Sequence, residues 1–297
     1  VAQALEAELN SEVAMFRGCM FAMNTAKTYR THLATFLDFC NKLCIPPVPV
    51  SESTVARYAA FLARKLKPAS VRQYLNVVRI LHLESGLDNP CKDSRLVKST
   101  LKGIEREKGC EIVRKTPITP PLLMEIRSKL SLQTRNDCVL GAACLLMFFG
   151  LLRKSNLFAN GAEFCGEKQL TRDCFQAGRA SQFLSVVVCW SKNNQCRKRR
   201  QVINLPVLHP HPLCPVSAIV NMFKLTGPQA PKSPAFPLSS YTFCQRLRAV
   251  LSDRPNVTSH SFRRGGGGCY VGPLKWGPWR SCEESGRLEE FCLPGVS

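Results

Sequence analysis

The sequence predicts a mainly α-helical protein with a small β-sheet, an α+β fold, in which an amino-terminal helical domain precedes a mixed α/β domain. Two observations support this prediction. Apolar residues recur at helical spacing over most of residues 25–107. Between residues 183 and 207 the pattern changes to two apolar runs rich in β-branched residues, separated by a polar loop. With 297 residues, the chain is long enough for two domains that each bury a core.

The amino-terminal domain is predicted to span residues 20–108 and to contain helices at about residues 25–44, 51–66, 70–86 and 92–107. A capping residue or a helix breaker bounds each of them. The expected N-caps of the first three helices are Thr25, Ser51 and Ser70. In the fourth helix, Leu96, Leu101 and Ile104 should face the core.

A basic, proline-bearing segment at residues 109–120 is predicted to be a linker, and the second domain should span residues 121–266. We expect helices at about residues 122–130, 134–152, 218–225 and 240–251, and strands at residues 183–190 and 201–207. The helix at 134–152 is strongly apolar, so it should be buried, and Arg153 follows it directly. A buried helix that ends in arginine must give the charge a partner, which is either solvent or an anion.

The chain is strongly basic. Its 41 Lys and Arg residues against 21 Asp and Glu residues give a net charge of +20, with an isoelectric point of about 9.6. Such a chain is expected to bind a polyanion, most often nucleic acid. A membrane surface is the rival, but the longest apolar run, residues 138–152, is too short to span a bilayer. The residues of the first domain that we single out as DNA contacts, rather than as a solvated basic face, are Lys27, Arg30, Arg64, Lys65, Arg72 and Arg79.

The 16 cysteines are scattered without the paired spacing of a disulfide framework or a zinc site. We therefore expect reduced thiols in an intracellular, reducing compartment, and no bound metal. No signal peptide is visible in residues 1–10. The basic run at residues 197–200 is either a solvated turn or a nuclear-import patch, and we expect a nuclear location.

His260 and Arg263 lie three residues apart, so they share one face if their segment is helical. A guanidinium group matches two phosphate oxygens, and an imidazole can donate or relay a proton near neutral pH. The pair therefore suits a reactive phosphate. Taken alone it is a weak signal, and an exposed helix start with a basic face is the more common explanation.

Three segments of the second domain together resemble the catalytic domain of the tyrosine recombinases, the phage integrase family. They are Phe149–Asn156, Trp190–Lys192 and His260–Gly266. The helices of the first domain similarly resemble the family's SAM-like core-binding domain, so the resemblance covers residues 20–266. The divergent sequence and the many cysteines suggest the branch that eukaryotic mobile elements carry.

The resemblance implies DNA strand cleavage and joining through a 3′-phosphotyrosine intermediate. Arg153 and Arg263 would bind the non-bridging oxygens of the scissile phosphate. Lys192 would protonate the departing 5′ oxygen, and His260 would assist the clamp or the proton transfer. A tyrosine would attack phosphorus and keep the bond energy in the ester, so the resemblance implies no cofactor and no metal. The implied partners are double-stranded DNA and further copies of the chain, which form tetramers in the family.

The end of the chain departs from the family's pattern. The family's nucleophilic tyrosine lies in the last helices, whereas Tyr270 is the one tyrosine beyond Arg263 and is too close to it in sequence. A one-base shift in a permitted back-translation of Ser281–Ser297 can yield the string VVKSQGDWRSFAYLEY, which would restore a tyrosine at about the family's spacing. We therefore expect a frameshift near Gly266, an aberrant tail at residues 267–297, and a nucleophile that the written sequence does not identify.

The written chain is thus predicted to bind DNA without cleaving it, and whether it is an enzyme stays open. The leading hypothesis is a tyrosine recombinase by ancestry that is inactive as written. The alternative is a non-catalytic DNA-binding protein derived from a mobile-element recombinase. An RNA-binding or scaffold protein is a third hypothesis, which the sequence favours little because it carries no stacking-aromatic motif of the RNA-recognition type.

Overall fold

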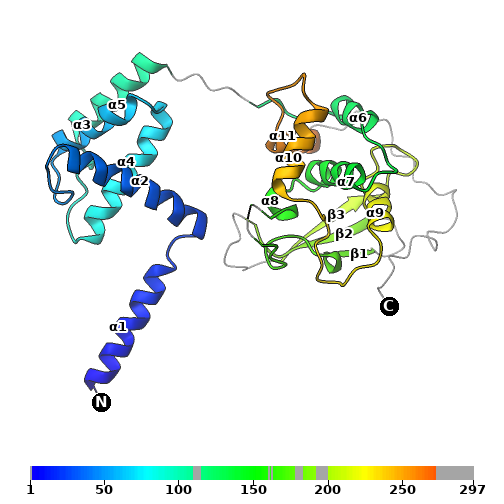
Figure 1. Ribbon diagram of the computed structural model, residues 1–297, viewed down its shortest axis with the longest axis horizontal. Helices are drawn as coiled ribbons and strands as arrows, with labels where there is room; N and C mark the ends of the chain where they lie inside the picture. Colours follow the sequence, from blue (N-terminus) through cyan, green and yellow to red (C-terminus); the bar gives the residue numbers. More distant parts are fainter. Residues whose placement is uncertain are drawn as a thin grey trace. The chain divides into compact units, whose positions relative to one another are not determined.

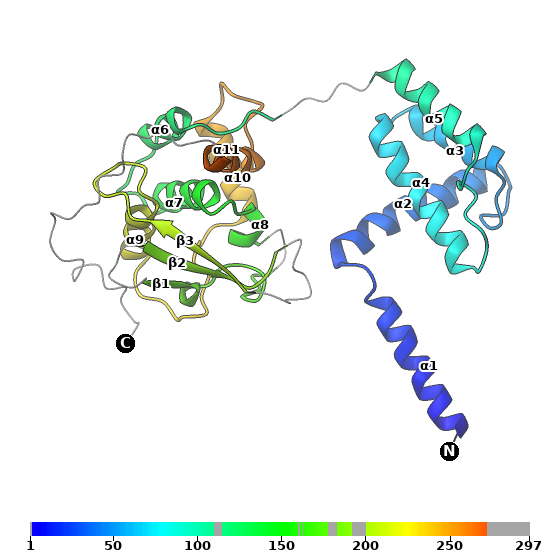
Figure 2. The same cartoon turned by 180° about the vertical axis from the view of Figure 1, so that it is seen from behind.

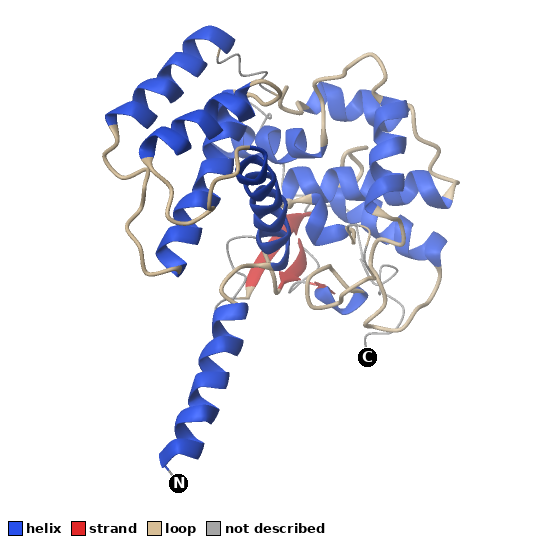
Figure 3. Cartoon of the chain, turned by 60° about the vertical axis from the view of Figure 1, so that its left-hand side comes forward, coloured by secondary structure: helices blue, strands red, loops and turns tan. Residues whose placement is uncertain are grey.

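The computed structural model describes residues 2–109, 115–159, 161, 163–177, 183–191 and 200–271. The chain divides into two compact units, Val1–Ile112 (unit 1) and Val113–Ser297 (unit 2). Helices dominate both units, and a small antiparallel sheet belongs to unit 2 (Figure 3, helices blue and strands red). The predicted α+β fold is therefore confirmed. Across the described ranges, no helix has both the length and the apolarity that crossing a membrane requires.

The described part of unit 1 is a bundle of helices (Figure 1). They are α1 (Ala2–Gly18), α2 (Met23–Lys42), α3 (Glu52–Ala63), α4 (Pro68–Glu84) and α5 (Arg95–Lys108). The side chain of Tyr58 is fully buried, and its ring centroid lies 5.0 Å from those of Phe36 and Phe39. Helix α1 contributes no buried residue. Helices α2 to α5 therefore hold the core of this unit.

One of the three predicted N-caps in unit 1 is confirmed. The Ser51 hydroxyl oxygen accepts a hydrogen bond of 3.3 Å from the backbone N–H of Thr54 in the first turn of α3. The predictions for Thr25 and Ser70 are wrong, because both residues lie inside the first turn of their helices. Helix α4 begins at Pro68 instead, since the proline ring fixes a helical φ and lacks the N–H that the first turn leaves unpaired.

The prediction that Leu96 faces the core is wrong as well. Ser94 caps α5, its hydroxyl accepting a bond of 3.2 Å from the N–H of Val97. The inward stripe is therefore Val97, Leu101 and Ile104, which repeat at helical spacing, and Leu96 lies one residue off that stripe with 46% of its surface exposed.

Unit 2 is built around a central apolar helix (Figure 2). Its helices are α6 (Pro120–Ser128), α7 (Arg135–Phe149), α8 (Lys154–Leu157), α9 (Pro215–Thr226), α10 (Ser240–Val250) and α11 (Ser259–Val271), with the short 3-10 helix η1 (Arg172–Cys174). Every residue of α7 from Cys138 to Phe148 is buried, as predicted. Both views show α7 between the sheet on one side and α6 and α11 on the other.

The sheet of unit 2 contains β1 (Phe175–Ala177), β2 (Phe183–Val188) and β3 (Gln201–Pro206), paired antiparallel in that order. Val186 of β2, which is fully buried, lies opposite Phe175 of β1 and Ile203 of β3. The predicted β2–β3 hairpin is confirmed, and its loop at 192–199 lies outside the described residues. Strand β1 was not predicted, because a strand of three residues is too short to show a period.

The end of α7 differs from the prediction. The helix stops at Phe149, and Leu151 adopts a left-handed backbone with φ of 52°. This turn reverses the chain so that Arg153 precedes a new helix, α8, instead of ending the old one.

The first described segment of unit 2 is hydrogen-bonded to its last described helix region. The N–H of Thr116 donates to the carbonyl of Asn256 (3.2 Å), and the N–H of Ile118 donates to the carbonyl of Ser261 (3.0 Å). A Cβ atom on Gly265 would overlap the carbonyl oxygen of Ile118. Glycine at this position therefore lets α11 approach the 115–118 backbone closely.

Candidate functional site

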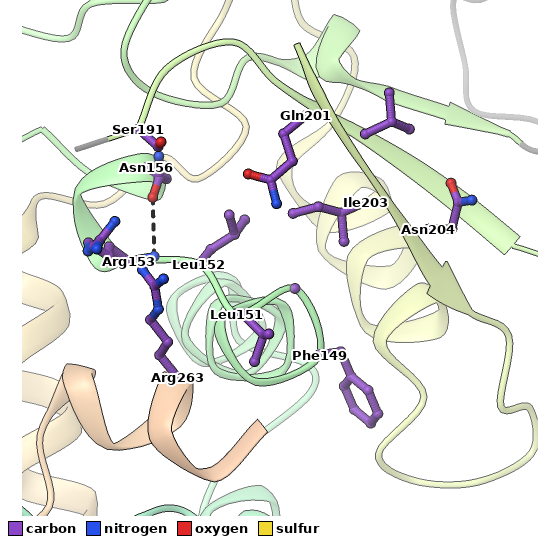
Figure 4. Close-up of a pocket in the computed structure, with 12 residues that line it drawn as sticks. Phe149, Leu151, Leu152, Arg153, Asn156, Ser191, Gln201, Ile203, Asn204 and Arg263 are labelled. Atoms are coloured by element: carbon purple, nitrogen blue, oxygen red, sulfur yellow. Dashed lines mark hydrogen bonds between the residues drawn. The ribbon is translucent and has the colours of Figure 1, made fainter. Parts of the chain in front are cut away.

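A cleft of about 410 Å³ opens in unit 2 where four segments meet (Figure 4). The end of α7, the turn before α8, the first residues of β3 and one side chain of α11 line it. Arg153 and Arg263, which the sequence predicted separately, both line this cleft. The structure thus brings together two of the four candidate catalytic residues.

Arg153 is held by its backbone at the start of α8. Its N–H donates to the side-chain oxygen Oδ1 of Asn156 (3.1 Å), and its carbonyl accepts from the N–H of Asn156 (2.9 Å). This reciprocal pair closes the first turn of α8. The guanidinium group consequently has no part in the helix cap, and Arg153 is among the residues that line the cleft (Figure 4).

Asn156 is a site residue that the sequence analysis did not single out. Its side chain is 3% exposed, and its Nδ2 group donates to the carbonyl of Trp190 at 2.8 Å. One amide therefore joins the Arg153 turn to the chain that leads from β2 toward Lys192. A polar residue three positions after Arg153 was the available signal, but it became meaningful only once Arg153 was known to be an N-cap.

The two arginines of the cleft repel each other. Burial first, and the positive charge of Arg263 second, lower the pKa of the Arg153 guanidinium below its ordinary value. Within the described ranges, neither arginine takes part in an ion pair. Two guanidinium groups that line one cleft without an ion-pair partner among the described residues favour an anion, and a guanidinium fork is suited to phosphate oxygens.

Helix α11 is fixed where it presents Arg263. The Ser261 hydroxyl accepts from the N–H of Thr258 (3.0 Å), and Phe262 is fully buried. Gly266 allows the helix to touch α7, since a Cβ atom there would overlap the carbonyl oxygen of Phe148. Residues on both sides of Arg263 are thus locked by packing, which leaves its side chain as the part that reaches the cleft.

The remaining candidate residues are placed as follows. His260 is exposed in the first turn of α11 and is not among the residues that line the cleft. Lys192 lies outside the described residues, although its sequence neighbour Ser191 lines the cleft. The backbone of Tyr270 continues α11.

All six candidate DNA contacts of unit 1 are exposed. Two of them have partners on the protein. The guanidinium of Arg72 donates to Glu105 at 2.6 Å, and that of Arg79 donates to the side-chain oxygen of Asn76 at 3.0 Å. Residues Arg64 and Lys65 lie between α3 and α4.

The fold of the chain is that of the integrases of lambda phage and of a transposon. A lambda integrase dimer bound to a COC′ core site has a TM-score of 0.52 and 15% identity, over 90% of this chain and 69% of that one. A lambda integrase tetramer bound to a Holliday junction has a TM-score of 0.54 and 14% identity, over 91% and 74%. The Tn1549 transposon integrase in complex with circular intermediate DNA has a TM-score of 0.54 and 13% identity, over 90% and 88%.

A sequence relative points to the same class. The integrase/recombinase xerD homolog of Selenomonas ruminantium is 30% identical over 142 residues, which are 46% of this chain and 40% of that protein. The chain thus matches less than half of that relative's length. No family model matches the chain. The chain is thus similar in part of its sequence to an integrase/recombinase homolog and in fold to integrases, which agrees with the resemblance to the tyrosine recombinases, and the eukaryotic branch stays a prediction.

Proposed function

We propose that the chain is a DNA-binding protein of the tyrosine recombinase type, in which Arg153 and Arg263 bind one phosphate of double-stranded DNA. The observation that carries this proposal is the pair of arginines in one cleft with no ion-pair partner among the described residues. Charge-assisted bonds from two guanidinium forks neutralise a phosphate and stabilise the extra charge of a pentacovalent transition state. Units 1 and 2 would serve as the core-binding and catalytic domains.

In the reaction of this class, Lys192 would act as the general acid for the 5′ oxygen, and His260 would assist the arginines. A tyrosine would form the covalent 3′ ester with DNA. The written chain offers Tyr270 alone beyond Arg263, so we expect it to bind DNA without cleaving it. The alternative is a non-catalytic DNA-binding protein, which acts by occupying its sites on DNA.

Further parts of the proposal are self-assembly on DNA, a nuclear location and an origin in a eukaryotic mobile element.

The charge variant Arg153→Ala tests the phosphate site. We expect duplex DNA to bind about tenfold more weakly or worse, because a hydrogen bond to a charged group contributes about 1.5–3 kcal/mol. The measurement is a titration of full-length protein against labelled duplex at fixed salt. Arg248→Ala is the matched control. Arg248 is exposed on α10 and does not line the cleft, so this substitution removes the same charge at a place outside the site.

Equal losses of DNA affinity in Arg153→Ala and Arg248→Ala would favour binding by occupancy alone.

A nicked suicide duplex tests cleavage directly, and we expect no covalent protein–DNA band. A band that disappears in Tyr270→Phe would overturn the prediction of an inactive chain. Sequencing of the transcript across the Gly266 codon tests the frameshift, and an uninterrupted frame without a further tyrosine would contradict it.

A further inference from the structure

We propose that the apolar side of the cleft binds the nucleoside attached to the phosphate that Arg153 and Arg263 hold. Phe149 and Ile203 form this side, and Leu151 lies at its boundary with the arginines. This inference rests on the proposed function and adds a second subsite to it. Figure 4 shows the two arginines on one side of the cleft, Phe149 and Ile203 on the other, and Leu151 between them. The volume of about 410 Å³ is within the range of sites that hold whole small molecules, about 300–1,000 Å³, and so exceeds the needs of a phosphate group alone.

The backbone of Leu151 is the observation that points to a use for this side of the cleft. Its φ of 52° lies in the left-handed region, where an L residue other than glycine is strained and glycine is not. Leu151 is only partly buried and does not belong to the hydrophobic core of unit 2. The hydrophobic core of unit 2 therefore does not account for a leucine here. Its side chain packs instead against α11 at Gly266, and the residue also lines the cleft. Strained residues of this kind concentrate at sites that bind ligands.

The strained backbone puts the Leu151 side chain between two elements of the site. Its Cδ2 atom lies 2.8 Å from the point where a Cβ atom of Gly266 would be, so the leucine covers α11 at the glycine that follows Arg263 by three positions. A glycine at position 151 would remove this contact with α11 and the apolar surface beside the arginines. The leucine thus makes the boundary between the charged side and the apolar side of the cleft.

The chemistry of the two sides matches a nucleotide and not a free anion. In a duplex the faces of a base are stacked on its neighbours, so a nucleoside offers the apolar surface of its sugar and the polar groups of the base edge. Phe149, Leu151 and Ile203 supply apolar contact for the sugar, since burial of such surface favours binding. The side chain of Gln201 is exposed, lines the same cleft and is drawn extending into it from the start of β3 (Figure 4). Its amide can both donate to and accept from a base edge.

Two small probes separate the nucleoside subsite from the phosphate site. Dimethyl phosphate carries the diester anion without a nucleoside, and the thymidine dinucleotide TpT carries the same anion with a nucleoside on each side. Both would be titrated into the full chain and followed by ligand-observed NMR. We expect TpT to bind more tightly than dimethyl phosphate. In Leu151→Gly we expect TpT to bind about fivefold more weakly, while dimethyl phosphate binds as before.

The variants distinguish the possible failures. Leu151→Asn is the second test, because asparagine tolerates a left-handed backbone and also removes the apolar surface. The proposal that the apolar side of the cleft binds a nucleoside is overturned if both Leu151 variants leave the affinity for TpT unchanged. It is also overturned if they lower the affinities for both probes equally. If Arg153→Ala changes neither probe, or neither probe binds the parent chain, the phosphate site and thus the proposed function fail as well. Weaker TpT binding in both Leu151 variants, with dimethyl phosphate unchanged, supports the proposal.

Discussion

The two arginines of the cleft carry like charges in a partly buried site, and this arrangement determines which ligands the site favours. Arg153 loses solvation on entering the cleft and meets the field of Arg263, and both effects disfavour its charged form. An anion between the guanidinium groups removes the repulsion and replaces the lost water contacts. The same argument explains why an amide, and not a carboxylate, is useful at Asn156. An amide organises the Arg153 backbone without bringing a negative charge that would compete with a phosphate.

We expect Asn156→Ala to lower the free energy of unfolding of unit 2 by about 1–3 kcal/mol, because it leaves partly buried backbone groups of Arg153 and Trp190 without their partner. Urea unfolding followed by tryptophan fluorescence measures it, since all three tryptophans follow unit 1 in the sequence and Trp190 is the residue whose carbonyl Asn156 binds. The loss should also weaken DNA binding through the displaced Arg153.

The isosteric variant Asn156→Asp is the matched control. Its carboxylate still accepts from the Arg153 N–H but cannot donate to the Trp190 carbonyl and brings a negative charge. A variant Asn156→Ala that unfolds and binds DNA like the parent chain would show that the amide does not organise the site.

At the scale of elements, α11 carries Arg263 and depends on two glycines for its position. Gly265 touches the Ile118 backbone and Gly266 touches the end of α7. Both are inside a helix, where glycine is intrinsically unfavourable by about 1 kcal/mol relative to alanine. Close approach to neighbouring backbone offsets that cost here, because no side chain fits.

We expect Gly265→Ala to destabilise unit 2 by about 1–3 kcal/mol or more, since the added Cβ atom forces α11 away from Ile118. Gly103→Ala is the control, because Gly103 lies in α5 with no atom near its Cβ position, and alanine there should stabilise unit 1 by about 1 kcal/mol. Urea unfolding followed by circular dichroism compares them. Similar effects of the two changes would contradict the close packing of α11.

At the scale of the whole molecule, the net charge of +20 dominates any encounter with DNA. The affinity for duplex DNA should fall steeply with salt, because each phosphate contact releases counterions. Binding of an uncharged partner would show little of this dependence.

We expect Arg64→Ala to reduce the slope of log affinity against log salt by about one unit, as the loss of one phosphate contact does. Arg72→Ala should reduce it less, since Arg72 already pairs with Glu105. Binding titrations over a series of salt concentrations measure both slopes. An unchanged slope in Arg64→Ala would remove the α3–α4 turn from the DNA interface.

The sequence was a good guide to long apolar patterns and a poor one to short-range geometry. The burial of α7 followed from its composition, and the β2–β3 hairpin followed from two β-branched runs. The convergence of Arg153 and Arg263, more than 100 residues apart in the printed sequence, followed from the family resemblance and not from local pattern. Leu96 was misplaced because its neighbour Val97 takes the inward position in the first turn of α5, whereas Leu101 and Ile104 face the core as predicted.

The remaining features could not be predicted because they depend on contacts between distant segments. Asn156 has meaning only beside Trp190, and Gly265 has meaning only beside Ile118. The left-handed backbone at Leu151 has no sequence signal, since leucine does not favour it.

The hydrogen bond between Ile118 and Ser261 joins segments that are far apart in the sequence, so it can form only late in protein synthesis. The ribosome makes residues 115–118 well before residues 256–261, so the first described segment of unit 2 waits for its partner until most of that unit has emerged. Unit 1 has its own core, and nascent chains generally fold domain by domain from the amino terminus. The basic helices of unit 1 are therefore folded on the growing chain while the cleft is still incomplete. A growing chain can therefore bind a polyanion through unit 1 before the cleft of unit 2 can bind a phosphate.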